Sequence, residues 1–317
     1  MKKLALWILS MSFASLGTAA GLADYSRAQL PEGKRAVSGT NAVSVMFLGV
    51  TTLLIDDGET AIMTDGYFSR PGNVSTARIS PDTAIITKHL QRAGVKSLAV
   101  VVPLHSHFDH ALDSPLVAKQ TGALLAGSNS TANIARGYDF PQTSMRVVTD
   151  GQTLGFGKFK ITFIVSAHLP ADFALGEITA PIALSARASD FKVGEAYSLL
   201  VEHEGRTILI QGSAGFKPGA LSGRKAEVVY LGIGGLSGRD EAYQDTYWQE
   251  TVLSVGAKRV IATHWDNFYK PLDEPLVPFP GFERAMDGLI ARAKKEGVEI
   301  RLQREWIWVD PFAAIPK

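Results

Sequence analysis

Three histidines and one aspartate lie within six residues of one another, at His105, His107, Asp109 and His110. They follow a Val-rich apolar stretch, which predicts a buried strand that ends here and turns into a helix beginning near Ala111. Imidazoles and a carboxylate buried without partners are costly, so the cluster indicates a divalent metal ion. Alternate side chains of an extended segment share a face. His105 and His107 can therefore reach one ion together, and Asp109 and His110, beyond the bend, can reach a second.

Nitrogen and carboxylate ligands without sulfur favour zinc, with iron and manganese as less favoured alternatives. The chain contains no cysteine, so neither a thiolate ligand nor a disulfide is available to it. A solvent-exposed histidine cluster is the alternative to a metal site. We expect two zinc ions.

The H-x-H-x-D-H motif at residues 105–110 resembles the signature of the metallo-β-lactamase superfamily. The resemblance covers about residues 43–309. It implies an αββα sandwich, with the site at the edge between two sheets, and further ligands at the ends of later strands. His168, after the expected strand 161–165, and His264, after the expected strand 260–263, occupy two of these ligand positions.

The superfamily usually places a bridging aspartate at the end of a strand between these two histidines, and here that strand ends at Ser213. A neutral hydroxyl is a weaker ligand than a carboxylate, so the second metal should bind less tightly. The third subclass of metallo-β-lactamases also has a serine there, which leaves Ser213 either a ligand or a near neighbour. In that arrangement the first zinc is held by His105, His107 and His168, and the second by Asp109, His110 and His264.

Other residues are expected to support the site. Asp65, at the end of an early strand, resembles the superfamily's buried aspartate that orients a ligand histidine. The alternative is a turn aspartate beside Gly66. Tyr67, Phe68 and Trp265 are expected to form the apolar wall of the substrate pocket, with an ordinary core role as their alternative.

The ligand set and the resemblance together predict hydrolysis of a small molecule. A bridging water with its pKa lowered to about 7 would attack an acyl or phosphoryl centre, and Asp109 would orient the resulting hydroxide. Segments 65–71 and 264–271 look similar to the branch that contains a lactonase and a phospholipase D. We therefore expect an ester, lactone or phosphodiester substrate. Residues 169–194, rich in Ala, Pro and Ser, are expected to cover it, or else to pack as a helix or hairpin.

Two other functions stay open. An exported β-lactam hydrolase fits the serine at 213, but the residues after His168 differ from the Thr-Pro-Gly turn usual in those enzymes. A metal-binding protein without hydrolytic turnover is the alternative of another class. A diiron oxygen-reducing protein is disfavoured, because such chains use acidic ligands where His110 and Ser213 stand.

Two similar halves are expected to position these residues. Strands at 43–50, 51–55 and 61–64 are echoed by strands at 198–201 and 207–210, and the strand at 94–104 is echoed by one at 256–263. Helices at 241–255 and 282–296 show apolar stripes and stop at glycines. We expect an α/β fold of the metallo-β-lactamase type with two related halves.

Composition adds limits to partners and location. Lys2 and Lys3 precede an apolar run at 4–16, which predicts a signal peptide over residues 1–20, followed by an N-terminal arm at 21–42 and one domain at 43–317. We therefore expect a periplasmic or secreted protein without stable membrane insertion after processing, and the alternative is that residues 1–20 stay attached as a membrane anchor. A formal net charge of +1 in 317 residues, without basic runs, argues against a nucleic-acid partner.

Overall fold

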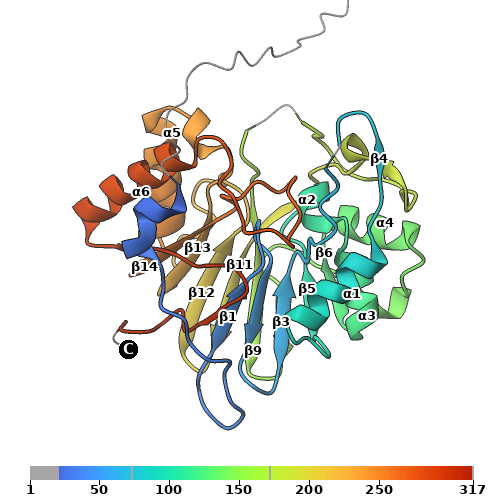
Figure 1. Ribbon diagram of the computed structural model, residues 1–317, viewed down its shortest axis with the longest axis horizontal. Helices are drawn as coiled ribbons and strands as arrows, with labels where there is room; N and C mark the ends of the chain where they lie inside the picture. The colour runs from blue at the N-terminus through green and yellow to red at the C-terminus, as the bar shows by residue number, and fades with distance from the viewer. Residues whose placement is uncertain (1–20, 73, 171–172, 316–317) are drawn as a thin grey trace, which may run out of the picture.

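Two seven-stranded mixed sheets form the centre of the protein, with helices on both outer faces (Figure 1). The computed structural model describes residues 21–72, 74–170 and 173–315. The first sheet has the order β16 (Trp308–Val309), β1 (Ser44–Phe47), β2 (Leu53–Asp56), β3 (Ala61–Thr64), β5 (Val100–Val102), β6 (Leu124–Gly127) and β7 (Met145–Val147). The second has the order β15 (Glu299–Leu302), β14 (Arg259–Thr263), β13 (Val228–Gly232), β12 (Arg206–Gln211), β11 (Ala196–His203), β9 (Phe159–Ser166) and β8 (Thr153–Phe156).

Three strands that have parallel neighbours on both sides are buried along their whole length. Every residue of β5, β13 and β14 is buried. Parallel strands covered on both faces are expected to be continuous apolar runs, as these largely are. One apolar cluster draws residues from both sheets, so the core lies between them. The predicted αββα sandwich is confirmed.

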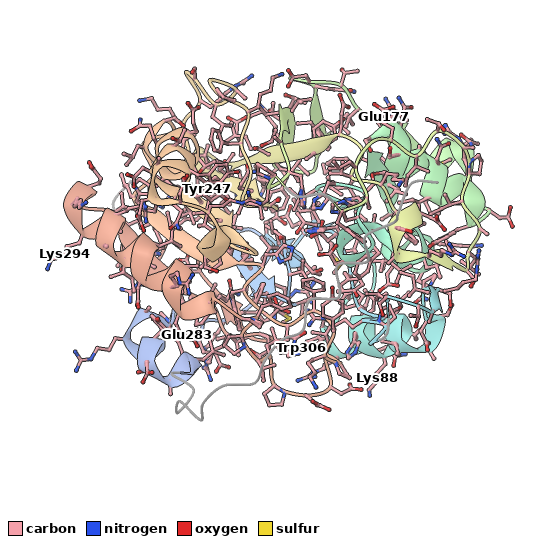
Figure 2. The ribbon with its side chains drawn as sticks, turned by 90° about the horizontal axis from the view of Figure 1, so that it is seen from above. Lys88, Glu177, Tyr247, Glu283, Lys294 and Trp306 are labelled. Atoms are coloured by element: carbon pink, nitrogen blue, oxygen red, sulfur yellow. The ribbon has the colours of Figure 1, made fainter. Side chains whose placement is uncertain are left out.

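Helices cover the two outer faces. In Figure 1, α5 and α6 lie beside the second sheet, and α1, α3 and α4 lie beside the first. Seen from above in Figure 2, Lys294 of α6 and Lys88 of α1 stand on opposite sides of the molecule. The α-helices are α1 (Thr83–Arg92), α2 (Phe108–Ala111), α3 (Ser114–Thr121), α4 (Asn129–Gly137), α5 (Glu241–Trp248) and α6 (Phe282–Glu296). The 3-10 turns are Leu22–Ala28, Gln142–Ser144, Ala188–Asp190 and Leu236–Gly238.

The two C-terminal helices differ in how regular they are. Helix α6 has the predicted bounds and ends at Gly297, which takes a left-handed φ of 69°. The helix expected over 241–255 is α-helical only to Trp248 and continues as a π-helical segment, Gln249–Leu253. The hydroxyls of Thr251 and Ser254 donate to carbonyls one turn earlier, and such back-bonding is known to distort helices.

The two halves share one connection pattern. In each, an antiparallel pair is followed by a parallel neighbour: β2, β3 and β5 in the first sheet, and β11, β12 and β13 in the second. The predicted correspondence between the strands that lead to His105 and His264 therefore differs by one strand position in the two sheets. Strand β5 lies directly beside β3, whereas β14 is separated from β12 by β13.

The N-terminal arm packs against the domain. The ring of Tyr25 lies 5.2 Å from that of Phe282, and the amide of Leu30 donates to the carbonyl of Leu302 at 2.8 Å. The predicted signal peptide, residues 1–20, lies outside the described residues. Within the described part of the chain, no helix combines the length and apolar character needed to cross a membrane.

Candidate metal centre

Strand β5 and the turn after it deliver the histidine motif. The helix expected near Ala111 begins three residues earlier, at Phe108, so Asp109 and His110 lie within helix α2. His107 stands just before the helix with an extended backbone, φ −61° and ψ 155°. The turn is held by the amide of Ser106, which donates to the carbonyl of Val193 at 3.0 Å.

The first triad consists of His105, His107 and His168. Nε2 of His105 lies 3.2 Å from Nδ1 of His107, and the ring of His168 is centred 4.8 Å and 4.6 Å from their two rings. Nδ1 of His168 lies 2.7 Å from the carbonyl oxygen of Leu169, a bond that assigns the proton to Nδ1. The lone pair of His168 is therefore on Nε2.

The second triad consists of Asp109, His110 and His264. Nε2 of His264 lies 3.3 Å from Oδ2 of Asp109 and 3.3 Å from Nε2 of His110. In each triad the ligand atoms lie within 4.8 Å of one another. His264 follows β14 with φ 53°, and its amide donates to the carbonyl of Val50 at 2.6 Å, which fixes the turn.

Asp65 lies directly behind the second triad. Its Oδ2 is 2.8 Å from Nδ1 of His110, and its Oδ1 accepts from the amide of Leu104 at 2.9 Å. A carboxylate at Nδ1 assigns the proton of His110 to that nitrogen, which leaves the lone pair of Nε2 facing Asp109 and His264. This is the orienting contact that the resemblance implies for Asp65.

The environment sets the charges of these groups. Burial lowers the pKa of His105 well below its usual range and that of His168 to about 4, so both stay neutral. Burial also lowers the pKa of His110, but the nearby carboxylates of Asp65 and Asp109 outweigh this and raise it. Burial raises the pKa of Asp109, and the positive potential of His110 and His264 outweighs burial and lowers it. Asp109 is therefore ionised.

The donor set fits divalent cations. His110 and His168 each use Nδ1 for a hydrogen bond to a protein oxygen, so their Nε2 lone pairs point into the site. Nε2 of His110 faces Nε2 of His264 at 3.3 Å. Neutral imidazole nitrogens and an ionised carboxylate are the ligands that zinc and related metals prefer.

Solved structures share this architecture, and a curated relative matches part of the sequence. The metallo-β-lactamase fold protein YhfI of Bacillus subtilis has a TM-score of 0.50 to this chain at 16% identity, covering 85% of this chain and 99% of that one. The chain has the metallo-β-lactamase fold. CmlA, a diiron β-hydroxylase of Streptomyces venezuelae, has a TM-score of 0.52 at 14% identity, covering 84% of this chain and 53% of that one.

The curated relative is a UPF0173 metal-dependent hydrolase of an Exiguobacterium species. It is 28% identical over 168 residues, which is 52% of this chain and 66% of the relative, just under two thirds of its length. No protein family model matches the chain. The metallo-β-lactamase fold therefore rests on the likeness to solved structures.

Within this metallo-β-lactamase fold, Ser213 follows β12 and stands beside the triads. Its hydroxyl oxygen accepts from the amide of Leu169 at 2.9 Å, which ties it to the segment carrying His168. It lines the same cavity as Asp109 and His264. The hydroxyl oxygen has a second lone pair, which this hydrogen bond does not use.

The pocket wall expected at Tyr67, Phe68 and Trp265 requires correction. These side chains are buried, and none lines the cavity beside the triads. The left-handed turn at Asp65 and Gly66 directs the chain back into the core, and the ring of Trp265 packs between Phe47 and Phe282. All three have their alternative role, as core residues.

Other aromatic residues form that wall. The cavity has a volume of about 440 Å³, and its rings come from four separate segments of the chain. Phe108 falls in the histidine motif, Phe173 in the segment expected to cover the substrate, and Phe268 and Tyr269 in segment 264–271, so Phe279 alone among these rings lies outside every segment that the sequence singled out. The cavity is lined by Val74, Ser75, Phe108, Leu169, Phe173, Ser213, Gly234, Gly235, Phe268, Tyr269 and Phe279, together with His107, Asp109, His168 and His264.

The segment expected to cover the site, residues 169–194, is mostly irregular. It contains strand β10 (Ala186–Arg187), which pairs with β4 (Arg78–Ile79). Phe173 lines the cavity, and its ring is centred 5.8 Å from that of His107. The carbonyl of Ala174 accepts from the amide of Val193 at 2.9 Å, so the segment folds back on itself beside the site.

Proposed function

We propose that this protein is a metal-dependent hydrolase that holds two zinc ions and cleaves an ester, a lactone or a phosphodiester. The observation that carries the proposal is the pair of ligand triads at one end of an apolar cavity. The name of the curated relative, a metal-dependent hydrolase, supports it.

Each triad would hold one ion. His105, His107 and His168 supply three neutral imidazoles to the first, and Asp109, His110 and His264 supply one charge and two imidazoles to the second. Zinc ions held by these residues would lower the pKa of a water molecule to near 7 and would polarise the scissile group.

The chain's own residues orient the reacting groups. Asp109 is an ionised acceptor at the junction of the triads, where it can hold a water proton and direct the water toward the cavity. Asp65 accepts the Nδ1 proton of His110 and so turns Nε2 of that ring toward His264. The rings of Phe108 and Phe268, which line the cavity, exclude bulk water from the substrate side.

Metal content and turnover test the proposal together. The protein is reconstituted separately with zinc, iron or manganese. The zinc preparation should contain close to two ions per chain and should hydrolyse at least one ester, lactone or phosphodiester reporter. The variant His107→Ala should lose metal and activity together, because one missing imidazole leaves the first site incomplete. His89→Gln, a change at a buried histidine outside the triads, is the matched control. Absence of stoichiometric metal, or full turnover without it, contradicts the proposal.

We also propose that the protein acts after export. Lys2, Lys3 and the apolar run at 4–16 support this. Mass spectrometry of the native protein should find a new N-terminus between Gly21 and Asp24. Recovery of the intact Met1 form from soluble cytosol contradicts it.

A further inference from the structure

Aromatic rings flank both triads of the site. The ring of Phe268 is centred 5.6 Å from His264 of the second triad, and that of Phe173 lies 5.8 Å from His107 of the first. Phe268 stacks on Phe279 at 5.5 Å with an interplanar angle of 9°. A ligand whose reacting group lies at the triads therefore has its body against flat apolar surfaces.

The described residues of the cavity wall include no cationic side chain that could pair with a negatively charged ligand. Among the described residues that line it, none is a lysine or an arginine, and its ionisable groups are candidate metal ligands and Tyr269. Two cationic residues lie close in sequence to the site. Arg70 is fully buried in an ion pair with Asp266, 2.8 Å long, and Lys270 is exposed and outside the lining.

Arg239 lies in a second cavity, which has a volume of about 800 Å³ and shares His168 and Leu169 with the first. Its guanidinium donates to the carbonyl of Pro170. Glu195 lines the same second cavity. An anion bound there would meet a carboxylate as well as a guanidinium, so this cavity is not a dedicated anion site.

We propose that the substrate has an uncharged, apolar body that is held in the aromatic cavity, as in a carboxylic ester or lactone of a hydrophobic acid or alcohol. This rests on the hydrolase proposed above and narrows its substrate class. A β-lactam carries a carboxylate on its body, for which this wall has no partner. The charge of a phosphodiester lies on the reacting group itself, where bound metal ions would offset it, so the wall selects against a charged body and not against a charged reacting group. In the reaction, the acyl carbon–oxygen bond breaks, water supplies the new oxygen, and its proton passes to the leaving alkoxide.

Two matched reporters separate charge from shape. Zinc-loaded mature protein is assayed with 4-nitrophenyl butanoate and with 4-nitrophenyl succinate, which differ by a terminal carboxylate. We expect kcat/KM to be at least about tenfold higher for the butanoate. Equal or better turnover of the succinate or of a chromogenic β-lactam overturns the inference and leaves the hydrolase standing.

Binding gives a readout that needs neither metal nor turnover. N-phenylbutanamide and N-phenylsuccinamate are the corresponding stable amides, and their affinities for metal-free protein can be measured by calorimetry. The uncharged amide should bind about tenfold more tightly. Equal or reversed affinities contradict the inference. If metal binds but no reporter is turned over, the hydrolase proposal fails, and the amides still decide the preference of the cavity.

A positive charge placed in the cavity wall should reduce the preference for the uncharged reporter over the charged one. Phe173 is 46% exposed, so Phe173→Arg should fold and bring a cation beside the cavity. It should shift the butanoate to succinate ratio toward succinate by about tenfold. Leu184→Arg, at an equally exposed residue of the same covering segment outside the cavity, is the matched control and should leave the ratio unchanged. A ratio that depends on Arg239, tested with Arg239→Gln, would assign substrate recognition to the second cavity and overturn the inference.

Discussion

Oδ2 of Asp65 lies 2.8 Å from Nδ1 of His110, and both side chains are fully buried. A buried carboxylate that accepts from an imidazole fixes which ring nitrogen carries the proton and how the ring is turned. Asp65 directly follows strand β3 of the first sheet, whereas His110 lies in α2, after β5. The orientation of one candidate ligand therefore depends on the register of two neighbouring strands.

Asp65→Asn should weaken metal binding at the second triad about 10- to 100-fold, the usual effect of losing such a partner. The amide keeps the size of the side chain but removes the charge that holds the His110 proton. Competitive zinc titration against a chelator measures this, and urea unfolding of metal-free protein checks the fold. Asp273→Asn, at a half-exposed aspartate, is the control. Unchanged zinc affinity in Asp65→Asn would give Asp65 a purely structural role.

Much of the candidate site could be predicted because its residues follow strand ends. A buried strand that ends in H-x-H-x-D-H fixes the motif locally, and His168 and His264 each follow a strand at the predicted place. The sheet brings these ends to one edge. The strand expected over 94–104 is regular only at Val100–Val102, which shortens the element without moving His105.

The cavity wall could not be predicted, because a strand end does not determine where the next ring points. Tyr67 follows Asp65 and Gly66, whose φ values of 52° and 82° turn the chain inward. The rings that do line the cavity, such as Phe108 and Phe279, come from segments far apart in sequence. Only tertiary packing brings these rings together, so no local pattern of the sequence could have predicted the cavity wall.

Arg70 and Asp266 form a fully buried ion pair beside the site. Oδ1 of Asp266 also accepts from the amide of Val50, whose carbonyl receives the amide of His264. Arg70→Met should lower the free energy of unfolding by about 3–5 kcal/mol, because it leaves a buried carboxylate without its counter-charge.

Urea unfolding of metal-free protein measures that loss. Lys88→Met is the matched control, since Lys88 pairs with Asp273 at the same 2.8 Å but with 60% and 50% of the two side chains exposed. An exposed pair contributes about 0–1 kcal/mol. Equal losses in the two variants would contradict the prediction.

Asp57 should make stability depend on pH in acid. Burial alone would raise its pKa, but hydrogen bonds from the amides of Thr60 and Glu59 and from His203 outweigh burial and lower the pKa below its ordinary 3.8. A lowered carboxyl pKa contributes stability that is fully present above pH 3.8 and is lost as pH falls through the folded pKa.

Asp57→Asn should therefore cost about 1.5–3 kcal/mol at neutral pH, the scale of hydrogen bonds to a charged group. The difference from the parent should shrink as the pH falls below 3.8. Urea unfolding of metal-free parent and variant across this range gives the two curves. A difference that stays constant through this range, or grows, would show that the charge of Asp57 is not what stabilises the fold.

Ser213 stands at the position where the resemblance described above implies a bridging aspartate, and its hydroxyl accepts from the amide of Leu169. Ser213→Ala should keep two zinc ions per chain and cost about 1 kcal/mol of stability, because that amide loses its acceptor.

Ser213→Asp adds a negative charge beside the triads, so zinc affinity of the second triad should rise about tenfold, or about 1.4 kcal/mol. Ser213→Asn has the same shape as the aspartate without the charge and should give no such gain. Competitive zinc titration of the three variants decides the role of position 213. Loss of metal in Ser213→Ala would make the hydroxyl a ligand, and equal affinities in the aspartate and asparagine variants would place this position outside the reach of the ions.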